Sequence, residues 1–327
     1  MMRRWLFKVA CLASALGAWA ASGAALAQPS YPNKPIRMIV PFAAGGSTDT
    51  LARTVAQKLS ESLGQTVFVE NRAGGNATIG SDALRKSPPD GYTIMMTSVD
   101  HTVIPQLLVT PYDPIKDFAP VGAVSYTQML LVANPSVPAN NAQELLALAK
   151  AKPNELNYSS SGTGGVPHLT GELLGKVTGS KIQQVPYKGG GPAMVDLIGG
   201  VVQLNMGPPI NAIPYIRSGK AKPIAITGTR RLDALPQVPT FEESGVPGLD
   251  VKTWFAMFAP AQTPKPIVDK LSQELIKVLA RPDVKEVLAG QGMEPYPLTA
   301  DEFAAVVKAD YAKYGEIIRA GNIKLEN

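Results

Sequence analysis

The chain has 327 residues, a formal net charge of +5 at pH 7, one cysteine and two histidines. This length is enough for one large or two medium domains, each with a buried core. Few thiol and imidazole groups are available, since His101 and His168 are the only histidines. A thiolate or zinc site is therefore disfavoured, and we expect no metal and no cofactor.

The N-terminus has the pattern of a secretory signal peptide. Arg3 and Arg4 precede an apolar segment of small residues that ends in Ala25-Leu26-Ala27. This pattern predicts a signal peptide over residues 1–27, cleavage after Ala27 and a periplasmic destination. A membrane anchor is the alternative, but the apolar core is short for a span. Cleavage would remove Arg3, Arg4 and Lys8, so the formal charge would fall from +5 to +2 (5 − 3). A nearly neutral chain gives no reason to expect nucleic acid as a partner.

The mature chain begins with the pattern of a strand, a glycine turn and a helix. Residues 36–40 carry no charge except Arg37 and are rich in β-branched residues, which predicts a buried strand. Gly45 and Gly46 allow a sharp turn, and leucines at helical spacing follow from Leu51. Unpaired N–H groups and the helix dipole would point the same way here, which suits an anion. An ordinary strand-to-helix turn is the alternative.

The same alternation of strands and helices continues along the chain. Strands are predicted at residues 66–70, 92–98, 121–124, 128–132, 156–160, 182–185, 202–206, 223–227 and 253–259. Helices are predicted at residues 78–84, 142–150, 167–177, 192–198, 211–216, 264–279, 283–288 and 299–320. Residues 112–121 are rich in proline and are expected to be irregular. Such alternation is typical of mostly parallel sheets covered by helices.

The helical tail indicates how these elements are divided. No strand is predicted after Phe258, so the tail needs a sheet that is already built. We therefore expect two α/β lobes, with residues 28–125 plus 252–327 in the first and 126–251 in the second. Trp254 and Phe255 would lie in the core where the chain crosses between lobes.

Three predicted strands end in glycine turns of similar design, at residues 45–47, 161–164 and 188–191. Ligands of open α/β sheets bind at the carboxyl ends of strands. One turn belongs to the first lobe and two to the second, so a cleft between the lobes would be lined by N–H and hydroxyl groups. Such a surface suits a carboxylate. Phosphate is the competing anion, but neither the P-loop nor the dinucleotide glycine pattern is present.

Catalytic motifs are scarce. A Ser-His-Asp set of Ser161, His168 and Asp49 can be imagined, but His168 lies beside a glycine turn, where it more often fixes the loop or contacts ligand. Asp49 is expected to fasten the first glycine turn, and Lys188 either supplies positive potential or is simply solvated. We therefore expect no catalytic residue and no enzyme activity.

At this point the motifs resemble those of one family across the whole mature chain. The chain is similar to the Bug (TctC) receptors, the extracytoplasmic solute-binding proteins of tripartite tricarboxylate transporters. The motifs that carry the resemblance include Pro41-Phe42-Ala43-Ala44-Gly45-Gly46-Ser47-Thr48-Asp49, Glu70-Asn71-Arg72-Ala73-Gly74-Gly75-Asn76, Asp90-Gly91-Tyr92, Pro186-Tyr187-Lys188-Gly189, Leu235-Pro236-Gln237-Val238-Pro239-Thr240 and Trp254-Phe255.

The resemblance implies a two-lobed periplasmic binding protein of the type II-like Venus flytrap class, a monomer that closes on a small carboxylate or related organic solute. Membrane permease subunits would be its partners. The ligand-binding residues then expected are Phe42, Ala44, Gly45, Gly46, Ser47, Asp49, Ser98, Ser160, Ser161, Thr163, Gly164, His168, Lys188 and Gly189.

Two positions depart from the family pattern. Gly165 replaces a hydroxyl residue, and Gly207 with two prolines stands where the family often has an acidic residue. Both departures put amino acids in doubt as ligands, because an ammonium group needs a carboxylate partner. Two other functions stay open: a ligand-sensing module that signals to a membrane kinase, and a secreted hydrolase.

Overall fold

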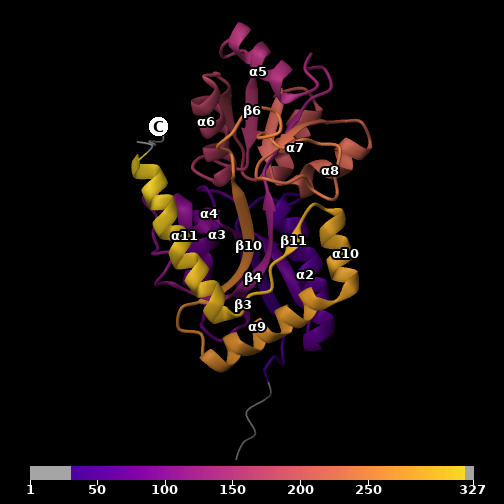
Figure 1. Cartoon of the computed structure of the whole chain (residues 1–327). Coiled ribbons are helices and arrows are strands. Elements are labelled where there is room, and N and C mark those ends of the chain that lie inside the picture. Colours follow the sequence, from indigo (N-terminus) through magenta and orange to yellow (C-terminus); the bar gives the residue numbers. More distant parts are fainter. Residues whose placement is uncertain (1–30, 321–327) are drawn as a thin grey trace, which may run out of the picture. The chain divides into compact units, whose positions relative to one another are not determined.

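In a computed structural model of the chain, the described residues are 31–320, without the side chains of Ile317 and Ala320. The predicted signal peptide and its cleavage site after Ala27 lie outside this range. From Lys34 onward the described chain belongs to one compact unit, which contains two sheets (Figure 1). Within residues 31–320, no helix combines the length and apolar character needed to span a bilayer.

The first sheet has six strands in the order β11-β4-β10-β3-β1-β2. Strand β1 pairs in parallel with β2 and β3, whereas β10 is antiparallel to β3 and β4. The strands are β1 (Ile36–Val40), β2 (Val67–Asn71), β3 (Thr93–Ser98), β4 (Phe118–Gln128), β10 (Lys252–Pro260) and β11 (Glu294–Pro295). Every residue of β3 is buried, as expected for a central strand with helices on its faces.

The second sheet has five strands in the order β7-β6-β8-β5-β9. Strand β6 pairs in parallel with β7 and β8, and β5 is antiparallel to β8 and β9. The strands are β5 (Leu130–Ala133), β6 (Asn157–Ser160), β7 (Gln183–Pro186), β8 (Leu204–Gly207) and β9 (Lys222–Ile226). The chain passes from the first sheet to the second at Met129, which separates β4 from β5, and returns between β9 and β10. The expected lobe limits, 28–125 plus 252–327 and 126–251, stay a prediction.

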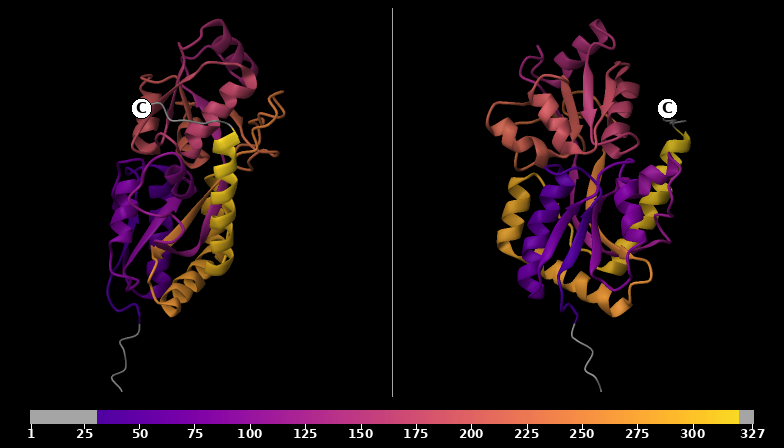
Figure 2. Two further views of the ribbon diagram at one scale, coloured as in Figure 1. Left: turned by 90° about the vertical axis from the view of Figure 1, so that its left-hand side faces the viewer. Right: turned by 180° about the vertical axis from the view of Figure 1, so that it is seen from behind.

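Helices α5–α8 lie around the second sheet, and the other long helices lie around the first (Figure 1). Helices α9 and α11 pack against β4, and the side view in Figure 2 shows α11 running along that sheet. The helices are α2 (Ser47–Leu63), α3 (Thr78–Arg85), α4 (Asp100–Val103), the 3₁₀ helix η1 (Ile104–Gln106), α5 (Ala142–Ala151), α6 (Val166–Thr178), α7 (Gly190–Ile198), α8 (Pro209–Arg217), α9 (Lys265–Ala280), α10 (Pro282–Gly290) and α11 (Ala300–Ala320).

Helix starts follow local capping rules. The Asn141 side chain accepts a hydrogen bond from the Glu144 N–H and so caps α5. At α11, the Glu302 carboxylate accepts the Thr299 N–H at 2.9 Å, and the Thr299 hydroxyl accepts the Glu302 N–H at 3.3 Å. This reciprocal pair is a capping box.

Three local expectations are wrong. Residues 118–121 belong to the long strand β4, because pairing with β10 compensates for Pro120 through a register shift. A short strand does follow Phe258, since β11 pairs with Tyr126 and Ser125 of β4. The sequence pattern also missed α4 and η1, which follow β3 directly and are too short to show a helical period.

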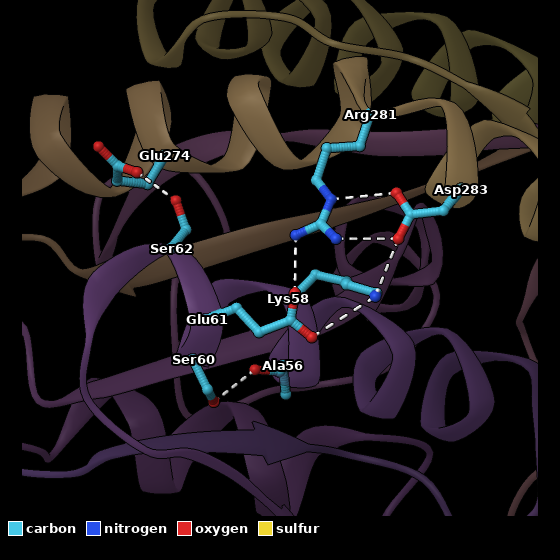
Figure 3. A network of polar contacts seen from close by, with 8 residues as sticks. All are labelled: Ala56, Lys58, Ser60, Glu61, Ser62, Glu274, Arg281 and Asp283. Atoms are coloured by element: carbon cyan, nitrogen blue, oxygen red, sulfur yellow. Dashed lines mark hydrogen bonds and ion pairs between the residues drawn. The ribbon is translucent and has the colours of Figure 1, made fainter.

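A polar network joins α2 to the helical tail (Figure 3). Arg281, between α9 and α10, donates to Glu61 at 2.7 Å and to Asp283 at 2.9 Å. Lys58 also pairs with Asp283 at 2.9 Å, and Ser62 hydrogen-bonds Glu274. The tail is thereby fixed to the helix that begins at the first glycine turn.

Candidate ligand-binding site

A cavity that opens to solvent lies where the two sheets meet. Its walls come from residues of both sheets and of the helices beside them. The lining residues are Phe42, Gly46, Ser47, Thr48, Ser98, Asp100, Met129, Ser161, Pro167, Gly190, Pro208, Thr253 and Phe255.

Four helices begin at this cavity. Gly46 precedes α2, Pro167 is in the first turn of α6, Gly190 is the first residue of α7, and Pro208 precedes α8. The first N–H groups of a helix have no partner within the helix, and the helix dipole is positive at this end. Within the described part of the chain, no lysine, arginine or histidine lines the cavity. Attraction for an anion would therefore have to come from backbone N–H groups and helix dipoles.

The first glycine turn is fastened by Asp49. Its carboxylate accepts the Gly45 N–H at 2.9 Å, the Arg53 Nε–H at 3.0 Å and the Asn71 amide at 2.8 Å. Burial alone would raise the pKa of Asp49, but these hydrogen bonds and the charge of Arg53 outweigh it, so the pKa is lowered. The turn is thus held in position by an ionised side chain that does not line the cavity.

The glycine turns of the two sheets touch across the cavity. The Ala43 N–H donates to the Lys188 carbonyl at 2.9 Å. A Cβ added to Gly191 would lie 2.4 Å from the Ala44 oxygen, and one added to Gly46 would lie 3.2 Å from the Gly190 nitrogen. Only glycine allows this approach of one backbone to another, so the structure is a closed form in which ligand would be enclosed.

The turn after β6 is fixed by contacts within and across the sheets. The imidazole Nδ1 of His168 accepts the Gly164 N–H at 3.0 Å, and burial lowers the pKa of His168. The Thr163 N–H donates to the Asn76 side chain at 3.2 Å, which joins this turn to the first sheet. The Ser160 hydroxyl donates to the Gly162 carbonyl at 3.1 Å and accepts from Gln184. These contacts shape the loop and do not point to catalysis.

Asp100 is the one acidic residue that lines the cavity among the described residues. It follows β3, and its side chain reaches the second sheet, where Oδ1 accepts the Val166 N–H at 2.8 Å. Burial raises the pKa of Asp100, while hydrogen bonds from Val166 and Ser98 lower it in part. Gly165 makes room for this carboxylate, because a Cβ there would lie 2.8 Å from Oδ2.

The structure brings only some of the expected ligand-binding residues to the cavity. Five line it: Phe42, Gly46, Ser47, Ser98 and Ser161. The other nine are outside its lining, and these are Ala44, Gly45, Asp49, Ser160, Thr163, Gly164, His168, Lys188 and Gly189. The Lys188 side chain is exposed, and only its carbonyl takes part in closure.

The sequence pattern missed several lining residues. The polar ones are Thr48, Asp100 and Thr253. Asp100 had a usable signal, because it comes two residues after a predicted parallel strand, where side chains face the ligand edge. Thr253 and Phe255 reach the cavity because antiparallel β10 runs beside β3, a pairing that local pattern does not reveal.

The described residues contain no group of three or more histidine, cysteine, aspartate or glutamate side chains that could hold a metal ion. The imagined triad is not assembled either. Asp49 is hydrogen-bonded to Gly45, Arg53 and Asn71, and His168 to Gly164. Nδ1 of His168 accepts a backbone N–H, and its Nε2 lies 3.7 Å from Glu172.

Two α/β sheets with a cavity between them define a solute-binding protein fold. Residues 51–323 match the tripartite tricarboxylate transporter family receptor, TctC. The chain belongs to this family. It is 37% identical over 315 residues to Protein BugT of Bordetella pertussis, covering 94% of this chain and 96% of that one.

Solved structures agree with this assignment. The periplasmic binding protein BugD superposes with a TM-score of 0.87 at 37% identity, covering 90% of this chain and 100% of that one. Rpa4515 of R. palustris, solved with adipate, gives a TM-score of 0.87 at 33% identity, covering 90% of this chain and 99% of that one. The fold is therefore that of the periplasmic binding proteins.

Proposed function

We propose that this protein is a periplasmic receptor that captures a small carboxylate in the cavity between its sheets and presents it to the membrane permease of a tripartite transporter. The N-terminal signal peptide would direct export and would be cleaved after Ala27. The TctC family consists of solute-binding receptors, and we extend this to the chain by proposing that it has no catalytic role.

The observation that carries the proposal is the convergence of helix N-termini on a cavity that, among residues 31–320, is lined by no cationic side chain. Gly46 and Ser47 start α2 without a side-chain cap, so the first N–H groups of that helix remain for a ligand. The Ser47, Ser98 and Ser161 side chains lie in the same lining. Several N–H and O–H donors around one point suit a carboxylate, which accepts charge-assisted hydrogen bonds.

Rpa4515 was solved with adipate, so a relative of the same fold holds a carboxylic acid. The closed contacts at Gly46 and Gly191 support a mechanism in which closure encloses the ligand. A closed form is favoured by a ligand only to the extent that ligand contacts it better than the open form.

A thermal-shift screen of mono-, di- and tricarboxylates tests the proposal. Protein stripped of bound solute by unfolding and refolding should show a raised midpoint with at least one carboxylate, since ligands that bind only the folded form stabilise it. Mass spectrometry of solute released from the untreated protein should find the same class. If no carboxylate stabilises the protein and a cationic or neutral solute does, the proposal is wrong.

A further inference from the structure

We propose that Asp100 selects the far end of the ligand, so that the preferred solute is a monocarboxylate with a hydrogen-bond donor, an ammonium group above all, at its other end. This inference rests on the proposed function and narrows it. It begins from the position of Asp100, a carboxylate that lines the same cavity as Gly46 and Ser47.

Asp100 already satisfies one of the four helix starts. Its Oδ1 accepts the N–H of Val166, the first residue of α6, at 2.8 Å. The positive end of α6 is therefore neutralised by a side chain of the protein itself. The starts of α2 and α7 at the cavity have no side-chain cap, whereas α8 begins with Pro208 and Pro209, which have no N–H to donate. A ligand carboxylate is therefore expected at the starts of α2 and α7.

The carboxylate of Asp100 has capacity to spare. It is 4% exposed, and hydrogen bonds from Val166 and Ser98 stabilise its charged form. Among the described residues, no lysine, arginine or histidine lines the cavity beside it. Two carboxylate oxygens offer about four acceptor sites. A buried carboxylate without a cationic partner is costly, and a ligand that brings an ammonium or hydroxyl group compensates it.

A dicarboxylate would meet the opposite situation. Its second carboxylate would enter a cavity that already holds the carboxylate of Asp100, and like charges in a partly desolvated site repel. Asp100, the first residue of α4, thus supplies the acidic side chain that Gly207 lacks. Asp100 stands at the cavity with Pro208, the residue that follows Gly207. Asp100 can pair with the ammonium group of an amino acid. Amino acids, which the sequence put in doubt, are therefore included among the proposed ligands.

The test uses calorimetric titration with ligands matched in length. The ammonium ligands are β-alanine, 4-aminobutyrate and 5-aminovalerate. The dicarboxylates succinate, glutarate and adipate have the same numbers of methylene groups, and the corresponding ω-hydroxy acids and unsubstituted acids complete the set. We expect the wild type to bind the best ammonium ligand at least ~10-fold more tightly than its matched dicarboxylate.

The variant Asp100→Asn keeps an acceptor for the Val166 N–H and removes the charge. We expect it to lose most of the preference, a change in the affinity ratio of ~10-fold or more. Asp301→Asn, at a side chain that is 89% exposed, is the control and should keep the wild-type ratio. If Asp100→Asn does not fold, Asp100→Ser takes its place. The affinity ratio of ammonium ligand to dicarboxylate in the wild type tests the proposal without any variant.

The outcomes separate the two proposals. A wild type that binds dicarboxylates as tightly as ammonium ligands overturns the selection by Asp100 and leaves carboxylate capture intact. An Asp100→Asn variant that weakens every ligand by the same factor also overturns it, because Asp100 would then act only as a contact between sheets. A wild type that binds none of these acids and no other carboxylate overturns the proposed function itself.

Discussion

Gly46 and Gly190 face each other across the cavity so closely that a Cβ on Gly46 would lie 3.2 Å from the Gly190 nitrogen. Gly46 precedes α2, which packs against the first sheet, and Gly190 is the first residue of α7, which packs against the second. Gly46 has φ −82°, a conformation open to any residue. The glycine is therefore required by the closed form and not by its own backbone.

Replacing Gly46 by alanine should oppose closure and spare the fold. We expect ligand affinity to fall by about tenfold, since an overpacked contact of this kind costs about 1–3 kcal/mol. The ligand-free thermal midpoint should change by no more than about 2 °C. Calorimetry and thermal unfolding measure the two effects. Gly290→Ala, at a helical site with open space around it, is the control and should bind normally. Unchanged affinity in Gly46→Ala would show that the turns do not meet in the liganded form.

Asp49 should be essential to the shape of the first turn. Its side chain is 3% exposed and accepts the N–H of Gly45, so Asp49→Ala leaves that N–H and the amide of Asn71 without their acceptor. We expect a loss of about 1–3 kcal/mol in the free energy of unfolding, measured with urea, and weaker ligand binding. Asp301→Asn again serves as the exposed control. Normal stability in Asp49→Ala would contradict this role.

His101 should make stability depend on pH. It stacks on Tyr112, its Nε2 donates to the Pro114 carbonyl at 3.2 Å, and burial lowers its pKa from 6.5 to about 4. The unfolded chain takes up a proton below about pH 6.5 and the folded one only near pH 4, so this contribution is lost as pH falls between these values.

Urea unfolding at about pH 7.5 and about pH 5 measures this contribution. Wild type should lose about 2 kcal/mol more than His101→Phe between these conditions, because phenylalanine does not titrate. The contributions of all other titrating groups are the same in both proteins and cancel in the comparison. Equal losses in the two proteins would mean that His101 is protonated in the folded state.

The network of Figure 3 should stabilise the fold through attraction between surface charges, which salt screens. Hydrogen bonds from Arg281 and Lys58 hold the pKa of Asp283 well below its usual range. Asp283→Asn should lower the thermal midpoint at low ionic strength, and about 1 M NaCl should remove most of the difference. A difference that persists at high salt would indicate packing and not charge. The variant should leave ligand affinity unchanged, since Asp283 does not line the cavity.

Much of this fold could be predicted because its strands and helices carry strong local signals. The strand before Pro41 forms as its pattern indicates, and the helices predicted at residues 142–150 and 299–320 form as α5 and α11. Strand β11 could not be predicted, because two residues show no periodicity and their pairing with β4 is a tertiary contact.

The site was predictable at the first turn and less so elsewhere. Gly46 and Ser47 combine a glycine turn with a helix start, and both line the cavity. His168 and Lys188 carry polar groups beside glycines, yet they fix loops or face solvent. Asp100 was missed because its role depends on reaching Val166 across the sheets, which local sequence does not encode.

Calorimetric titration of solute-free protein with the carboxylate panel tests the central claim most directly. The claim predicts that at least one small carboxylate binds with a 1:1 ratio and that Gly46→Ala weakens it by about tenfold, while Gly290→Ala does not. Binding of no carboxylate by the wild type, or equal affinity in Gly46→Ala, would contradict capture at the start of α2.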